Sequence, residues 1–166
     1  MERPEIDWED TDTLAAGVVG PQGRRVFFIQ ACRDKRIVSL KLEKQQIAGL
    51  AEFLESVLKD LPPSDKTENE IENMQTEFFD PGEPDWVIGS LGVSYDQSTD
   101  RLILLIEELV RDEDLQPATA RFPLRRSLIL PFIEQARIMV AAGRPPCPFC
   151  GAPLDPLADG WCPCVN

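Results

Sequence analysis

The feature that most constrains the fold of this chain is a change in the spacing of its hydrophobic residues. The spacing typical of strands is followed by the spacing typical of a helix, and this order occurs twice. Residues 13–42 hold three runs of β-prone residues, separated by the turn sequences Gly-Pro-Gln-Gly and Arg-Asp-Lys-Arg. They predict three short antiparallel strands. From Glu43 to Asp60 the apolar residues recur at steps of three and four, which predicts an amphipathic helix, and Pro62 and Pro63 end it. Such a helix is expected to pack its apolar stripe on the sheet.

The second half of the chain repeats this order. Three strand-like runs lie within residues 85–124, and a helical pattern covers residues 125–143. When the two helices are aligned, every apolar position of the first stripe meets an apolar residue of the second. The first stripe is Ile47, Leu50, Ala51, Leu54, Val57 and Leu58, and the second is Ile129, Phe132, Ile133, Ala136, Met139 and Val140. Gly17 and Gly20 align with Gly89 and Gly92. The pattern predicts an α+β fold, an antiparallel sheet with two helices, and an internal βββα duplication of residues 13–60 and 86–142.

Three segments flank or interrupt this predicted body of residues 13–142. Residues 1–12 form an acidic tail, because six of them are Asp or Glu. Residues 61–85 are rich in acids and poor in apolar residues, which predicts a solvated acidic linker. Residues 143–166 form a small tail that carries four of the five cysteines. At 166 residues the chain has the length of one domain with a small appendage.

Charge and composition exclude several classes of function. The chain has 17 basic and 29 acidic residues, so its net charge of −12 disfavours nucleic acid as a partner. It contains no histidine, which excludes Ser-His and Cys-His nucleophile pairs. No apolar run is long enough to span a bilayer, and the N-terminus lacks the order of a signal peptide. The sequence therefore predicts a cytoplasmic protein without a membrane segment.

The cysteines of the tail are spaced like metal ligands. Cys147 and Cys150 form a Cys-Pro-Phe-Cys-Gly knuckle, and Cys162 and Cys164 follow as Cys-Pro-Cys. Two such pairs across a hairpin place four thiolates around one zinc ion. The alternatives are a disulfide network, which a reducing cytoplasm disfavours, and a redox pair of the thioredoxin type, which normally opens a helix after a strand. The pattern favours a structural zinc-ribbon-like tail, and Cys32 is expected to be a buried, inert thiol.

The strings GRPPCPFCGAPLDP, VSLKLEKQQIAGLAE and GPQGRRVFFIQA resemble an uncharacterised bacterial family, a domain of unknown function found mainly in actinobacteria and Chloroflexi-type bacteria. The resemblance covers Gly17 to Cys162. In that family the tail closes with His-x-Cys-Pro-Arg, so Gly160 and Cys164 of this chain stand at the histidine and arginine positions. The resemblance thus implies Cys147, Cys150 and Cys162 as shared ligands, whereas Cys164 follows from the chemistry of thiols alone. It implies no established activity.

A local excess of arginine interrupts the acidic chain. Between Pro117 and Pro146 there are five arginines and one acid, Glu134. Two of them, Arg125 and Arg126, stand at the start of the second helix, where the helix dipole disfavours cations. They are expected either to pair with the linker acids Glu70, Glu72 and Glu77, or to form with Arg121 a basic surface next to the zinc tail that binds an acidic protein surface or a phosphate group.

Together these features favour a non-catalytic, zinc-containing protein-interaction or adaptor module. The alternatives are a nucleic-acid-binding zinc-ribbon protein, and an enzyme or regulatory subunit that uses carboxylates. The second of these is disfavoured by the lack of histidine, of a phosphate-binding glycine loop and of convergent acid and base groups.

Overall fold

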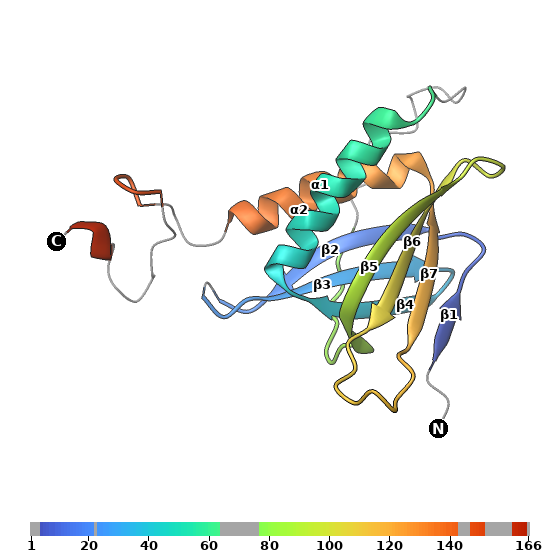
Figure 1. Cartoon of the computed structure of the whole chain (residues 1–166), viewed down its shortest axis with the longest axis horizontal. Helices are drawn as coiled ribbons and strands as arrows, with labels where there is room; N and C mark the ends of the chain where they lie inside the picture. Colours follow the sequence, from blue (N-terminus) through green and yellow to red (C-terminus); the bar gives the residue numbers. More distant parts are fainter. Residues whose placement is uncertain (1–3, 22, 64–76, 143–146, 152–160, 166) are drawn as a thin grey trace.

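The structure is a computed structural model that describes residues 4–21, 23–63, 77–142, 147–151 and 161–165. These residues form one sheet, two long helices and a terminal 3₁₀ turn (Figure 1). The strands are β1 (Glu5–Asp7), β2 (Thr13–Val19), β3 (Val26–Arg33), β4 (Arg36–Leu42), β5 (Trp86–Asp96), β6 (Arg101–Glu108) and β7 (Thr119–Leu124). The helices are α1 (Lys44–Asp60) and α2 (Arg126–Ala141), and the 3₁₀ turn is η3 (Pro163–Val165).

The sheet is mixed, with the strand order β1-β7-β6-β5-β4-β3-β2. Four neighbouring pairs are antiparallel, as predicted, but β4 pairs with β5 and β1 pairs with β7 in parallel. The prediction of a purely antiparallel sheet is therefore corrected at these two pairs. The parallel β4–β5 pair follows from the connection, because α1 carries the chain back so that β5 starts in the direction of β4.

The predicted order of elements is present twice, as β2-β3-β4-α1 and β5-β6-β7-α2. Each unit is a meander of three strands followed by a helix, and the two helices pack against each other over the sheet (Figure 1). In the sheet register Gly17 lies opposite Phe28, and Gly92 lies opposite Leu105. Gly17 thus corresponds to Gly92, and not to Gly89 as in the sequence alignment. A common origin of the units stays a prediction.

The core lies between the sheet and the helices. Both predicted stripes face it, with Ile47, Leu54, Ile129 and Phe132 fully buried. Helix α2 also protects the open edge of the sheet, because the Gln135 side chain accepts a hydrogen bond of 2.9 Å from the backbone N–H of Ala16 in β2. An edge strand whose N–H groups are occupied in this way is less able to pair with another chain.

The predicted acidic tail of residues 1–12 contributes to the body. Its residues Glu5–Asp7 form β1, and Ile6 and Trp8 are buried, the latter with its ring 4.9 Å from that of Phe122. Charged residues alternate with apolar ones here, so the acids reach solvent while the apolar side chains enter the core.

The end of the predicted linker is packed on the sheet. Phe78 lies over Gly17 and beside Phe28, with ring centroids 6.2 Å apart, on the face of the sheet opposite the helices. The Gln30 side chain accepts a hydrogen bond from the backbone N–H of Phe79 (2.9 Å) and donates one to its carbonyl oxygen (3.1 Å). Residues 77–85 are therefore a strap that is anchored on the sheet through Phe78 and the backbone of Phe79 and is otherwise exposed or half-buried. Residues 64–76 lie outside the described residues.

Candidate metal centre

The four cysteines of the tail form one cluster. Their Sγ atoms all lie within 4.8 Å of one another, although Cys150 and Cys162 are far apart in the sequence. Cys147 and Cys162 are buried, and Cys150 and Cys164 are exposed. The cluster lies beyond the end of α2, at one end of the molecule (Figure 1).

A tight turn positions the first pair. The backbone N–H of Gly151 donates a hydrogen bond of 2.9 Å to the carbonyl oxygen of Cys147, and Gly151 has a φ of +75°. A side chain would be strained in this left-handed conformation, so glycine suits the position. The turn brings the thiols of Cys147 and Cys150 to the same side of the chain.

The second pair is held by η3. Cys162 directly precedes this 3₁₀ turn, and Cys164 lies within it. η3 turns the chain directly after Cys162, and the Sγ atoms of Cys162 and Cys164 lie within 4.8 Å of each other. The sulfur atoms then pair across the two segments, with 3.6 Å from Cys147 to Cys164 and 3.6 Å from Cys150 to Cys162.

These distances fit a tetrahedral zinc site. With Zn–S bonds of about 2.3 Å, the sulfur atoms of a tetrahedron are about 3.8 Å apart. The two measured pairs are close to this value, and no disulfide joins the thiols of the described cysteines. The four side chains can therefore hold one metal ion, for which zinc is the typical choice with four thiolate ligands.

The cluster itself promotes the thiolate form of one ligand. The backbone N–H groups of Cys150 and Phe149 point at the Cys147 sulfur and lower the pKa of this thiol to about 6. The pKa of Cys164 is raised, because the neighbouring thiols of Cys162 and Cys150 disfavour a second negative charge. Four thiolates at such short distances repel one another, and a bound divalent metal ion would offset this repulsion.

The fifth cysteine is not part of the cluster. Cys32 lies in β3, opposite Thr13 and Ile37, and is partly exposed rather than buried as predicted. Its side chain points to the face of the sheet without helices, where the neighbouring strands cover it only in part.

Each of the three arginines considered for partner binding has contacts within the chain. Arg121 pairs with Asp7 at 3.5 Å, and Arg125 donates a hydrogen bond of 3.2 Å to the carbonyl oxygen of Asp12. The acids that neutralise this region thus include a residue of β1, and among the described residues Glu77 is not an observed partner of these arginines. Of the linker acids, residues 70 and 72 lie outside the described residues.

Arg126 is the most strongly held of the three. Its guanidinium forms an ion pair of 2.9 Å with Asp100, donates a hydrogen bond of 2.7 Å to the carbonyl oxygen of Pro62, and lies 5.9 Å from the centre of the Tyr95 ring. These contacts join the start of α2 to the β5–β6 turn and to the end of α1. They explain why a cation is tolerated at a helix N-terminus without a partner molecule.

The contacts of Phe78 and Phe79 could not be identified from the sequence. Two features of the sequence could have indicated these contacts. One is the aromatic pair in an otherwise polar segment, and the other is Gly17, which has no side chain and so leaves space above its strand. The significance of both depends on the strand register, which places Gly17 directly opposite Phe28.

No helix among the described residues is long and apolar enough to cross a membrane. No curated protein and no solved structure matches the chain.

One family does match. Residues 6–162 fit the family described as "Protein of unknown function (DUF3090)". The matched range includes the body and the cysteines Cys147, Cys150 and Cys162, and it ends before Cys164. Because it spans nearly the whole chain, the chain belongs to this family of unknown function, DUF3090.

Proposed function

We propose that this protein is a non-catalytic interaction module whose C-terminal tail is folded around one structural zinc ion. The observation that carries the proposal is the cluster of four thiols within 4.8 Å of one another. When bound, the zinc would supply folding free energy to a segment that is too short to have a hydrophobic core. Four protein ligands leave no position for water or substrate, which supports a structural role.

The proposed interaction role rests on a second set of observations. The net charge of −12 supports a protein rather than a nucleic acid as partner. Arg121 has 40% of its side chain exposed, whereas Arg126, with 22% exposed, is occupied by Asp100 and Tyr95. We place the protein in the cytoplasm, where reducing conditions keep thiols free for zinc.

Metal analysis of protein purified under reducing conditions tests the zinc proposal. We expect about one zinc ion per chain in the wild type, and a loss of nearly all zinc in Cys147→Ser, since a three-ligand site binds structural zinc far more weakly. Cys32→Ser is the matched control and should keep its zinc. Metal-free wild-type protein would refute the proposal, and a Cys164→Ser variant with full zinc content would remove Cys164 from the ligand set.

A further inference from the structure

The two units carry the same pattern of side chains on the face of the sheet opposite the helices. In each unit, one row of directly opposed residues consists of a glycine, a large apolar residue and a basic residue. The rows are Gly17, Phe28 and Lys41 in the first unit, and Gly92, Leu105 and Arg121 in the second. The adjacent rows are Ala15, Gln30 and Ser39, and Ser90, Glu107 and Thr119.

In the first unit this surface is a binding site that the chain itself fills. The Phe78 ring occupies the space above Gly17, where a built Cβ atom would overlap it. Gln30 fixes the backbone of Phe79 with two hydrogen bonds. As a result Phe28 and Gln30 are only 4% and 1% exposed.

In the second unit the corresponding surface is an open groove of about 450 Å³, which we call the β6 groove. All six residues of the two rows line it, together with Glu5 and Asp7. Leu105 is 44% exposed, and a Cβ atom built on Gly92 meets nothing within 4 Å. None of the described segments occupies the place that Phe78 takes in the first unit.

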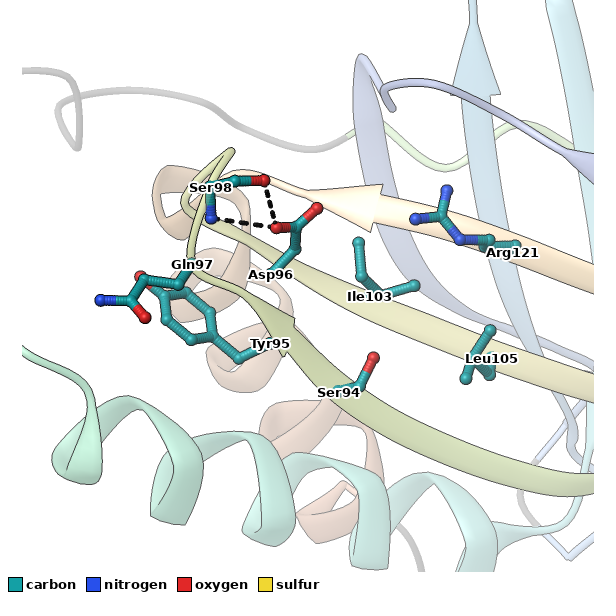
Figure 2. Close-up of a pocket in the computed structure, with 8 residues that line it drawn as sticks. All are labelled: Ser94, Tyr95, Asp96, Gln97, Ser98, Ile103, Leu105 and Arg121. Atoms are coloured by element: carbon teal, nitrogen blue, oxygen red, sulfur yellow. Dashed lines mark hydrogen bonds between the residues drawn. The ribbon is translucent and has the colours of Figure 1, made fainter.

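The groove continues along the sheet into a second hollow of about 620 Å³. Figure 2 shows Ser94, Ile103 and Leu105 on neighbouring strands, with Arg121 beyond Leu105. The Asp96 side chain at the far end accepts hydrogen bonds from Ser98 (Figure 2). The surface is therefore long enough for an extended segment rather than for a single side chain.

The charges of the β6 groove select a different occupant from that of the first unit. Glu107 replaces Gln30, and a carboxylate can only accept hydrogen bonds, so it favours a cationic donor. Glu5 and Asp96 add negative charge along the surface, and Arg121, the one cation among the described residues that line the two hollows, pairs with Asp7, so that their charges offset each other. An acidic segment such as residues 77–85 would be repelled here.

We propose that the β6 groove binds an extended peptide segment of a partner protein, with an aromatic side chain on Gly92 and Leu105 and a lysine or arginine at Glu107. The segment would lie as residues 77–85 lie on the first unit. This inference deepens the proposed function by naming the kind of partner. It involves only the body, so it does not depend on the zinc ion.

Two nine-residue peptides test the proposal on the full chain. The acidic peptide has the sequence of residues 77–85, Glu-Phe-Phe-Asp-Pro-Gly-Glu-Pro-Asp. The basic peptide is Lys-Phe-Phe-Lys-Pro-Gly-Lys-Pro-Lys, in which each acid is replaced by lysine. Calorimetry or fluorescence anisotropy should show that the basic peptide binds about tenfold or more tightly than the acidic one, because several charge pairs favour it.

Two substitutions locate the binding. Gly92→Val should weaken binding of the basic peptide by about tenfold or more, since the valine side chain takes the place of the aromatic ring. The fold should stay intact, because the space around this position is open. Glu107→Gln should reduce the preference for the basic peptide by about fivefold. The matched controls are Gly49→Ala and Glu52→Gln on α1, where Gly49 also has open space around its Cβ position and Glu52 is exposed. Both should bind like the wild type.

Three outcomes would overturn the proposal: no binding of the basic peptide, equal binding of the two peptides, or unchanged binding by Gly92→Val. A dimer of the wild type that Gly92→Val dissociates would identify a second copy as the occupant and would also overturn it. Zinc content measured in the same samples separates the two claims. Zinc-loaded protein that binds neither peptide would refute only the proposal that the β6 groove binds a peptide. Metal-free protein that binds the basic peptide would refute only the zinc proposal.

Discussion

At the scale of single residues, the four tail thiols differ in acidity although they share one cluster. Two backbone N–H groups stabilise the Cys147 thiolate, whereas Cys164 is next to other thiols that disfavour its charge. The spacing of the four cysteines in the sequence predicted that they lie together. It could not predict this ranking, which depends on the turn that aims the N–H groups of Phe149 and Cys150 at one sulfur.

This ranking belongs to the folded tail, so it should be lost when zinc is removed and the tail unfolds. Only the thiolate reacts, and a lowered pKa means that the thiolate forms at lower pH. In metal-free, reduced protein, labelling of Cys147 and Cys164 should therefore reach half its maximum at similar pH values, because the backbone N–H groups of Cys150 and Phe149 no longer converge on one sulfur. Mass spectrometry of iodoacetamide-treated samples across the pH range measures both. A midpoint near pH 6 for Cys147 and a much higher one for Cys164 would show that the described turns form without zinc.

The contacts of Arg126 lead to a second prediction. Arg126→Ala removes the ion pair with Asp100, which is partly shielded from water, and the exposed hydrogen bond to the Pro62 carbonyl. We expect the free energy of unfolding to fall by about 1–2 kcal/mol, measured by urea denaturation. Arg111→Ala, at an exposed position, is the control and should stay within about 0.5 kcal/mol of the wild type. Equal stability of Arg126→Ala and the control would show that the start of α2 does not depend on this residue.

At the scale of secondary structure elements, the sequence predicted most of the fold. The change of period located six strands and both helices, because burial on one face leaves a clear pattern in strands and helices of this length. It missed β1 and the strap of residues 77–85. Three residues are too few for a period to be visible, and β1 exists only through its pairing with β7. The strap depends on Gly17 and Phe28 being neighbours, which only the register reveals.

The strap predicts opposite effects for two glycines. Gly17→Ala places a methyl group where the Phe78 ring lies, so it should lower the free energy of unfolding by about 1–3 kcal/mol through overpacking. In Gly92→Ala the new methyl group extends into open space, so the free energy of unfolding should change by no more than about 0.5 kcal/mol. Urea denaturation of both variants measures the difference. If they are equally stable, Phe78 does not occupy the site above Gly17 in solution.

At the scale of the whole molecule, the protein consists of a body with its own core and a tail organised by four thiols. The core comprises residues of β1 through α2, from Ile6 to Met139, and includes none of the tail cysteines. The sequence predicts a division between body and tail, since four of the five cysteines lie in the last residues. The repeated outer surface of the two units could not be predicted from the sequence, because each of its rows joins residues from three strands.

The central claim is that zinc folds the tail and leaves the body unchanged. The most direct measurement is a titration of zinc into metal-free, reduced, isotope-labelled protein, followed by two-dimensional amide NMR spectra. We expect the changes to be confined to residues 143–166 and to saturate at about one zinc ion per chain. Changes throughout β2 to α2, or a spectrum that zinc does not alter, would contradict the claim.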